Sequence, residues 1–416
     1  MLEEVRIQKL VHGGQGLGVL ADGRKIFVWN ALPGERVKAR IIRKKRSYAE
    51  AIAEEILEAS LERVNPKEKN YLATSPWQIM NFEAENKYKG EIVSELYAQA
   101  HVDIPTFVVT HTDIQWNYRN KMEYSFWGDE AGVHLALHNR GSHQKSIVTG
   151  STLALAPVDI AAQTIVNILN EKQTRAGDLK TVVVRSSQKG VVVASLFVKT
   201  ETFQKIELPA ELQGIRVYYS NPKSPASVPT KLLYELGSTT LQDTLLDVMF
   251  SYDADSFFQV NLPIFEQTLI RIRDHCIADE LVDMYAGVGS IGLSVGHKEV
   301  TLIELDSATA AMARINAKAS ALQTEVVEAS TEKALNYITG DKPVVFDPPR
   351  AGLHDKVTGR VLQELPTQIV YLSCNPATQA RDLAQFQKNY AVDYFEVFNF
   401  FPQTPHIETL AVLKLR

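Results

Sequence analysis

From about residue 250 onward, apolar runs of strand length alternate with helical segments, and no other feature constrains the fold as strongly. The runs are Glu280–Met284, Glu299–Glu304, Thr324–Glu328, Lys342–Phe346, Gln368–Ser373, Tyr390–Phe398 and Leu410–Leu415. Alternating strands and helices build a doubly wound, mostly parallel sheet. The sequence therefore predicts an α/β, Rossmann-like domain over residues 249–416, ending in an antiparallel pair of strands. Functional side chains of such sheets gather at the carboxyl ends of the strands.

The rest of the chain has a different rhythm. A chain of 416 residues is too long for one typical core, so two or three domains are expected. Residues 1–57 contain five short strand-like runs separated by glycine-containing turns, which predicts a small OB-like β-barrel. Residues 58–248 predict a central α+β domain. Within it, the apolar spacing of residues 85–101 indicates a helix, which we expect to pack on the Rossmann-like domain.

Charge and cysteine content limit the classes of function. The net charge is −5, but residues 1–50 carry 11 Lys and Arg against 5 Asp and Glu, with a cluster at Arg43-Lys44-Lys45-Arg46. A basic module on an acidic body can hold a polyanion such as RNA, although a solvated strand end has the same composition. Two cysteines exclude a disulfide framework. No apolar stretch approaches a membrane span, so we expect a cytoplasmic protein that does not bind membranes.

A glycine-rich turn follows the first strand of the Rossmann-like region. Tyr285 opens the segment Tyr285-Ala286-Gly287-Val288-Gly289-Ser290-Ile291-Gly292, which contains G-x-G-x-x-G between a strand and a helix. Glu304 ends the next strand, nineteen positions after Tyr285, where its carboxylate can accept two ribose hydroxyl protons. Together these features favour an adenosine-bearing cofactor, either a dinucleotide or S-adenosylmethionine.

The fourth strand separates these two cofactors. It ends in Phe346-Asp347-Pro348-Pro349-Arg350, which places a carboxylate and a rigid proline pair at a strand's carboxyl end. Dinucleotide dehydrogenases have no evident need for this element, whereas methyltransferases use an Asp-Pro-Pro loop between the methyl donor and the base. Asp347 therefore favours S-adenosylmethionine.

Cys374 lies between the fifth strand and an amphipathic helix, Ala377 to Lys388. A cysteine in this position is either a small buried hydrophobe or a nucleophile at the ligand-binding edge of the sheet. The amino end of the helix would favour the thiolate. The neighbouring motifs favour the nucleophile.

Five segments, in this order, resemble the RNA uridine-5-methyltransferases, which make 5-methyluridine in tRNA and 23S rRNA. These segments are residues 256–261, 283–289, 346–352, 373–376 and 401–408. The barrel resembles that family's TRAM domain, and Tyr118-Arg119-Asn120-Lys121 resembles part of its central RNA-binding domain. In the latter segment, aromatic and basic residues interleave as on an RNA-binding surface, but core aromatics beside surface charges produce the same pattern.

The resemblance implies a class I methyltransferase in which Cys374 is the nucleophile and Glu408 the general base. It further implies that four residues hold S-adenosylmethionine, namely Gln259, Tyr285, Glu304 and Asp347. The chemistry asks for the same pair, because carbon 5 of uracil becomes reactive only after thiolate adds at carbon 6, and its proton must then be removed. Partial burial beside an apolar strand would raise the pKa of Glu408 into a useful range.

The sequence departs from the family at one place. Many members bind a four-iron cluster through four cysteines, but here the corresponding stretch reads Ala73-Thr74-Ser75-Pro76-Trp77-Gln78. We therefore expect no iron–sulfur cluster and no metal, with Trp77 packing the space and Cys276 structural. The expected partner is an RNA, rRNA or tRNA, bound by a monomer. Two alternatives stay open: an RNA cytosine-5 methyltransferase and a non-catalytic RNA chaperone.

Overall fold

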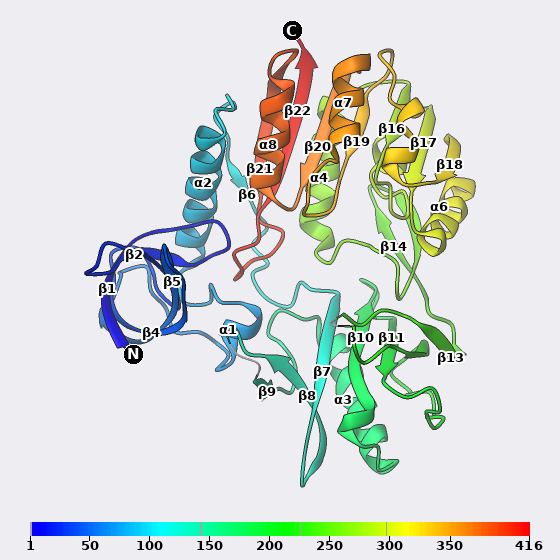
Figure 1. The fold of residues 1–416 in the computed structure, drawn as a ribbon. Helices are drawn as coiled ribbons and strands as arrows, with labels where there is room; N and C mark the ends of the chain where they lie inside the picture. The colour runs from blue at the N-terminus through cyan, green and yellow to red at the C-terminus, as the bar shows by residue number, and fades with distance from the viewer. Residues whose placement is uncertain (1, 142–143, 225, 297) are drawn as a thin grey trace.

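The computed structural model describes residues 2–141, 144–224, 226–296 and 298–416. Its strands form a closed barrel, a seven-stranded sheet, a two-stranded hairpin and an eight-stranded sheet. Figure 1 shows the barrel at the amino-terminal end, the seven-stranded sheet below and the eight-stranded sheet above. These assemblies correspond to the three predicted folds, while the predicted boundaries at residues 57 and 248 stay predictions.

The barrel confirms the fold predicted for the amino-terminal residues. Its strands are β1 (Leu2–Leu10), β2 (Gly16–Val19), β3 (Lys25–Trp29), β4 (Arg36–Lys44) and β5 (Tyr48–Glu58). They close in the order β1-β2-β3-β5-β4. Alternate side chains such as Val5, Ile7, Val37 and Ala39 point inward and are buried, as the two-residue period of a strand requires.

The seven-stranded sheet follows the order β13-β12-β11-β10-β7-β8-β9. Its strands are β7 (Lys121–Asp129), β8 (Gly132–His138), β9 (Lys145–Ile147), β10 (Leu179–Ser186), β11 (Val192–Val198), β12 (Gly214–Tyr219) and β13 (Lys231–Gly237). Helix α3 (Ala156–Glu171) packs on it through a shared apolar cluster. The short helix α1 (Tyr71–Thr74) lies in the segment between barrel and sheet.

The eight-stranded sheet has the order β18-β17-β16-β19-β20-β22-β21-β6. Its strands are β6 (Val109–Thr110), β16 (Glu280–Asp283), β17 (Glu299–Glu304), β18 (Gln323–Glu328), β19 (Val344–Phe346), β20 (Gln368–Ser373), β21 (Tyr390–Phe398) and β22 (Glu408–Leu415). Strands β16 to β20 are parallel, and β22 runs antiparallel to both β20 and β21. The predicted doubly wound sheet and final antiparallel pair are confirmed.

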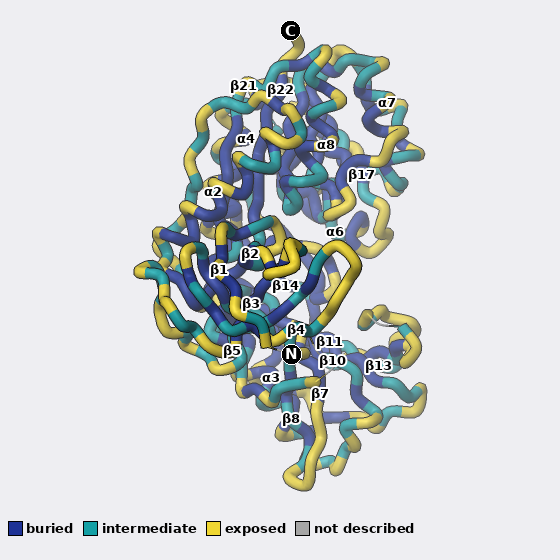
Figure 2. Tube along the Cα trace, turned by 60° about the vertical axis from the view of Figure 1, so that its left-hand side comes forward, coloured by how far each residue is buried: buried dark blue, intermediate teal, exposed yellow. Residues whose placement is uncertain are grey.

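Helices cover this sheet on both sides. They are α4 (Leu262–His275), α5 (Gly292–Val295), α6 (Ser307–Ala319), α7 (Asp355–Glu364) and α8 (Pro376–Phe386). One apolar cluster includes side chains of α7 and α8, and a second includes side chains of α4, α5 and α6. The strands between them are buried, as the dark tube in Figure 2 shows. A sheet covered on both faces explains why its strands read as continuous apolar runs.

Helix α2 (Phe82–Gln99) joins this assembly from outside the strand–helix series. Asn81 caps its start, because its side chain accepts a hydrogen bond from the Ala84 N–H at 2.8 Å. Tyr88, Ile92 and Tyr97 bury their side chains in the cluster that contains α8. The predicted packing of this helix on the Rossmann-like fold is therefore observed. The hairpin of β14 (Thr240–Leu245) and β15 (Val248–Asp253) spans the predicted boundary at residue 248.

Trp77 is the largest fully buried side chain, with 1% of its surface exposed. Its indole N–H donates to the Gly14 carbonyl of the barrel at 3.0 Å, and its ring belongs to the same cluster as α2. Trp77 therefore fills the space between barrel, α2 and the large sheet, as expected from the sequence. In the described ranges, no helix is long and apolar enough to cross a membrane.

Candidate active site

The glycine-rich turn lies at the carboxyl end of β16. Gly287 and Gly289 have φ angles of +56° and +88°, which favour glycine. A Cβ at Gly289 would come within 2.9 Å of Leu293 and Leu302, so close packing also requires glycine there. A Cβ at Gly287 would meet only the Phe257 carbonyl, at 4.0 Å. The backbone at Gly287 thus borders open space, as a ligand-binding turn would.

Glu304 ends β17 beside this turn. Its Oε2 accepts a hydrogen bond from the Gly287 N–H at 2.9 Å, and its Oε1 accepts one from the Asp306 N–H at 2.7 Å. The carboxylate is half-buried and held in one orientation at the edge of the sheet. The structure therefore brings Glu304 and the glycine-rich turn together, as the motif spacing predicts.

Gln259 belongs to a loop, residues 256–261, that residues of the seven-stranded sheet hold in place. Arg185 of β10 donates to the Ser256 carbonyl at 2.7 Å and to the Phe258 carbonyl at 2.9 Å. The Asn120 side chain donates to the Gln259 carbonyl at 3.0 Å. Gln259 is buried and its backbone is fixed from outside the Rossmann-like fold.

Arg185 is the residue that the sequence reasoning missed. It is 1% exposed, and burial lowers its pKa to about 10. A charged residue directly after the apolar run Val182–Val184 was the available signal, because a buried cation needs partners. Its partners are main-chain carbonyls, which sequence inspection does not reveal.

Most of the segment from Tyr118 to Tyr124 packs in the protein core and does not form an exposed RNA-binding surface. Tyr118, Asn120 and Tyr124 are buried, and the Tyr118 hydroxyl donates to the Pro402 carbonyl at 3.0 Å. Arg119 differs, since it is half-buried with its guanidinium 5.8 Å from the centre of the Phe401 ring. The RNA-surface interpretation therefore stays a prediction for Arg119 alone in this part of the segment.

Two aspartates lie at the ends of neighbouring strands β16 and β19. Asp283 is fully buried, and its Oδ2 accepts a hydrogen bond from the Gly292 N–H at 3.0 Å. Burial, with Glu304 as a weaker cause, raises the pKa of Asp283 to about 7. Burial and the charge of Asp283 raise the pKa of Asp347 to about 7. Tyr285, which follows β16 and is half-buried, also has a raised pKa, about 12, because of burial.

Cys374 and Glu408 are neighbours across two strands. Ser373 of β20 pairs with Thr409 of β22, so the next residue outward on each strand is Cys374 on one and Glu408 on the other. Paired positions of adjacent antiparallel strands lie about 5 Å apart. The two side chains come from sequence positions more than thirty residues apart, yet they share one end of the sheet.

The pKa of Cys374 shifts in the opposite direction to the one expected from the helix end. Burial raises the pKa of the thiol to about 12, and the charges of Glu408 and Asp347 act in the same direction. Helix α8 does begin beside it, with the Asn375 side chain accepting from the Ala377 N–H at 3.3 Å. Burial and two carboxyl groups outweigh the helix end, so the predicted preference for thiolate is wrong for this structure.

Glu408 is 4% exposed. Burial, and then the charge of Asp347, raise its pKa well above the usual value, while Arg350 acts in the opposite direction. The predicted direction for this pKa is confirmed. Arg350 is exposed at the rim, with its Nη2 3.4 Å from Nδ1 of His406. Burial, and then the charge of Arg350, lower the pKa of His406 to about 3.

Three carboxyl groups of this site form no ion pairs among the residues that the structure describes. Within the described part of the chain, no ion pair involves Asp283, Asp347 or Glu408. Phe257 in the loop 256–261 is 64% exposed, and Leu305, which follows Glu304, is 69% exposed. Unpaired carboxyl groups beside exposed apolar side chains fit a ligand that carries positive charge and an apolar ring.

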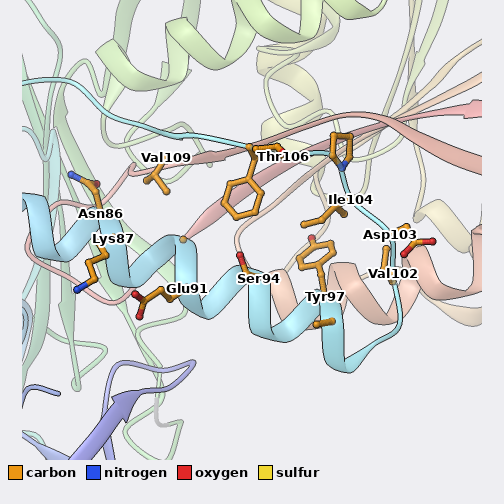
Figure 3. Close-up of a pocket in the computed structure, with 14 residues that line it drawn as sticks. Asn86, Lys87, Glu91, Ser94, Tyr97, Val102, Asp103, Ile104, Thr106 and Val109 are labelled. Atoms are coloured by element: carbon orange, nitrogen blue, oxygen red, sulfur yellow. The ribbon is translucent and has the colours of Figure 1, made fainter. Parts of the chain in front are cut away.

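A separate groove of about 850 Å³ lies between α2 and residues 102–109. Figure 3 shows Tyr97, Ile104 and Val109 around it, with Asn86 and Lys87 at one end. None of the candidate site residues lines this groove. In the ranges that the structure describes, no group of three or more His, Cys, Asp and Glu is placed to hold a metal ion.

Comparisons with known proteins agree with this architecture. Residues 83–416 match the tRNA (Uracil-5-)-methyltransferase family, and residues 3–53 match the TRAM domain. An uncharacterized RNA methyltransferase of Thermotoga maritima is 28% identical over 440 residues, covering 99% of both chains. Another, from Bacillus anthracis, is 29% identical over 449 residues, covering 99% of this chain and 96% of that relative.

A solved structure has the same fold. Pyrococcus abyssi tRNA (uracil-54, C5)-methyltransferase in complex with S-adenosyl-L-homocysteine aligns with a TM-score of 0.80. The two chains are 22% identical, and the alignment covers 99% of this chain and 100% of that one. The family match spans most of the chain, including every candidate site residue. The chain therefore belongs to the tRNA (uracil-5-)-methyltransferase family.

Proposed function

We propose that this protein methylates carbon 5 of a specific uridine in RNA, with S-adenosylmethionine as methyl donor and Cys374 as covalent nucleophile. The observation that carries the proposal is the pairing of Ser373 with Thr409, which sets Cys374 beside Glu408 at the edge of the sheet. Asp347 influences the pKa of both. A nucleophile, a buried carboxyl group and a cofactor carboxylate thus lie within one electrostatically connected site.

The residues present fit S-adenosylmethionine. This cofactor carries a sulfonium and an ammonium group, and the site contains buried carboxyl groups without cationic partners in the described residues. Four residues would hold it, with Glu304 on the ribose and Asp347 near the methyl-bearing end, assisted by Gln259 and Tyr285. The cofactor supplies an electrophilic methyl group, and all other groups in the reaction come from the chain and the RNA.

The chemistry then divides between two side chains. The Cys374 thiol gives its proton to solvent, and the thiolate sulfur bonds to carbon 6 of uracil. The electron pair of the carbon 5–carbon 6 double bond moves into an enolate, which makes carbon 5 able to take the methyl group. The Glu408 carboxylate next removes the proton from carbon 5, and the carbon 6–sulfur bond breaks to release the thiolate. Burial raises the pKa of Glu408, so its carboxylate is a stronger base for this proton than an exposed one.

The RNA reaches this site as a flipped nucleotide. Cys374 is half-buried behind the edge of the sheet, so a base stacked in a helix is out of its range. The exposed barrel tip Arg43–Arg46 supports RNA contact. Lys38 and Arg40 form ion pairs with Glu55 and Glu54. In the tip, by contrast, Arg43 is the residue with an ion pair among the described residues, to Glu50 at 3.6 Å. The substrate is a tRNA or 23S rRNA, and we propose a cytoplasmic monomer.

Covalent trapping tests the proposal. The protein is incubated with RNA containing 5-fluorouridine and S-adenosylmethionine, then run on a denaturing gel. We expect a stable protein–RNA adduct, because fluorine at carbon 5 cannot leave as a proton. Cys374→Ala should abolish the adduct and keep RNA affinity, while Cys276→Ala is the matched control, since Cys276 is buried outside the site and should leave the adduct intact.

Three outcomes contradict the proposal. A non-catalytic chaperone would give no adduct with any RNA. An adduct formed only with 5-fluorocytidine RNA would identify cytosine as the base. An adduct that survives Cys374→Ala would assign the nucleophile elsewhere. Mapping 5-methyluridine in total RNA from a deletion strain identifies which RNA is the substrate.

A further inference from the structure

A buried ion pair on α2 lies outside the residues that the proposed reaction uses. Nζ of Lys89 lies 2.8 Å from Oε1 of Glu85, one helical turn away, and both side chains are fully buried. Burying two charges is costly unless each forms further hydrogen bonds with good geometry. The other partners of the pair therefore show what the arrangement holds in place.

All of those partners lie in one loop. Lys89 donates to Oδ1 of Asn399 at 2.5 Å and to the Phe401 carbonyl at 3.2 Å. Glu85 accepts from Nδ2 of Asn399 at 2.9 Å and from the Gln403 N–H at 2.9 Å. The ion pair thus binds both side-chain and main-chain atoms of residues 399–403, although this loop lies more than 300 positions later in the sequence.

This loop follows Phe398, which pairs with Glu408 across β21 and β22, and it contains a strained turn. Gln403 has a φ of +67°, which is uncommon for a residue with a Cβ. Its N–H is held by Glu85, and its carbonyl accepts from the Trp77 N–H at 3.2 Å. Surrounding contacts must maintain such a conformation, because the backbone alone would relax from it.

We propose that Glu85 and Lys89 are positioning residues that set the loop 399–403 so that Glu408 faces the Cys374 adduct. This inference rests on the proposed function and adds a specific step to it. Loss of the pair leaves the nucleophile on β20 in place but shifts the base. Proton removal from carbon 5 should then slow, while formation of the adduct continues.

This step has its own signature. When proton removal is slow, the methylated adduct on Cys374 persists even with ordinary uridine RNA. A purely structural role for the ion pair would instead lower stability and slow every step together. Adduct persistence therefore distinguishes a positioning role from a structural one.

The experiment uses Lys89→Met and, as a variant that keeps the ion pair, Asn399→Ala. Both are mixed with uridine RNA and S-adenosylmethionine, quenched over time and run on a denaturing gel. We expect turnover to fall at least about tenfold, as small displacements of a reacting group produce, and covalent adduct to accumulate above the wild-type level. Adduct formation with 5-fluorouridine RNA should stay within about threefold of wild type.

Glu35→Gln is the matched control, because the buried Glu35 pairs with Arg63 at 2.5 Å and accepts hydrogen bonds from the Leu32 and Ser60 N–H groups instead of groups in the loop 399–403. It should lower the melting temperature without accumulating adduct. If Lys89→Met does not fold, Asn399→Ala decides. Folded variants that lose turnover without accumulating adduct on uridine RNA would overturn the inference. Failure of wild-type protein to form the 5-fluorouridine adduct would instead overturn the proposed function itself.

Discussion

Arg185 offers the sharpest test of how the seven-stranded sheet supports the cofactor loop. Its guanidinium donates to the carbonyls of Ser256 and Phe258, which directly precede the proposed cofactor residue Gln259 in the loop 256–261. Its Cζ also lies 5.2 Å from the centre of the Tyr252 ring. We predict that Arg185→Leu destabilises the protein and weakens cofactor binding, although Arg185 itself lies outside the site.

The magnitude follows from the hydrogen bonds. Leucine leaves two buried carbonyls without donors, and each unsatisfied buried group costs about 1–3 kcal/mol. We therefore expect Arg185→Leu to lower the free energy of unfolding by about 4 kcal/mol. Arg185→Lys keeps the charge but can reach only one carbonyl well, so we expect a loss of about 2 kcal/mol. This order of the two variants is part of the prediction.

Two measurements check it. Urea titration followed by fluorescence gives the unfolding free energies, and calorimetry gives the affinity for S-adenosylhomocysteine. Freeing the loop 256–261 should weaken that affinity at least about tenfold, or ~1.4 kcal/mol. Arg63→Leu is the control, because Arg63 also donates several hydrogen bonds, to the Glu35 carboxylate and the Asn30 carbonyl, and neither acceptor belongs to the loop 256–261. It should lower stability without changing the affinity.

A stability loss below about 1 kcal/mol for Arg185→Leu would contradict this prediction. Equal weakening of cofactor binding by Arg185→Leu and Arg63→Leu would also contradict it, because the loop contacts would then have no specific effect.

Three further predictions concern charge and packing. Because the charge of Asp347 helps raise the pKa of Cys374 to about 12, Asp347→Asn should speed alkylation of Cys374 by iodoacetamide severalfold at pH 9, measured by mass spectrometry. Gly14→Ala should lower the melting temperature more than Gly13→Ala, since both glycines have positive φ but only at Gly14 would a Cβ meet another side chain, at 2.3 Å. The pKa of Asp283 is raised to about 7, so its contribution to stability is present below pH 4 and is lost as the pH rises through 7. Wild-type stability should therefore fall between pH 5 and pH 8. In urea titrations over this range, Asp283→Asn should remove ~3 kcal/mol of that fall.

Each of these has a clear contrary result. Unchanged or slower alkylation in Asp347→Asn would mean that Asp347 does not act on the thiol. Equal melting temperatures for the two glycine variants would show that the barrel tip does not pack where the structure places it. A stability that falls from pH 5 to pH 8 by the same amount in wild type and in Asp283→Asn would assign the pH dependence to other groups.

Much of the site was predictable because strand ends are readable in sequence. The apolar runs ending near Asp283, Glu304, Asp347 and Cys374 place these residues at the carboxyl edge of one parallel sheet, whatever the details of packing. The barrel was predictable for a similar reason, since alternating burial and turn residues leave few other folds for fifty residues. Local periodicity is enough for both inferences.

Tertiary structure decided the rest. Lys89, which pairs with Glu85, also contacts Asn399, and these two residues lie 310 positions apart in the sequence. Arg185 binds main-chain carbonyls, and no residue pattern encodes the direction of a carbonyl. The protonation of Cys374 was misjudged because a helix end is visible in sequence, whereas desolvation and nearby carboxyl groups are not. Such energies depend on through-space distance and on the loss of water around a group. Local sequence thus determined which groups meet at the edge of the sheet, and packing determined their charge and orientation.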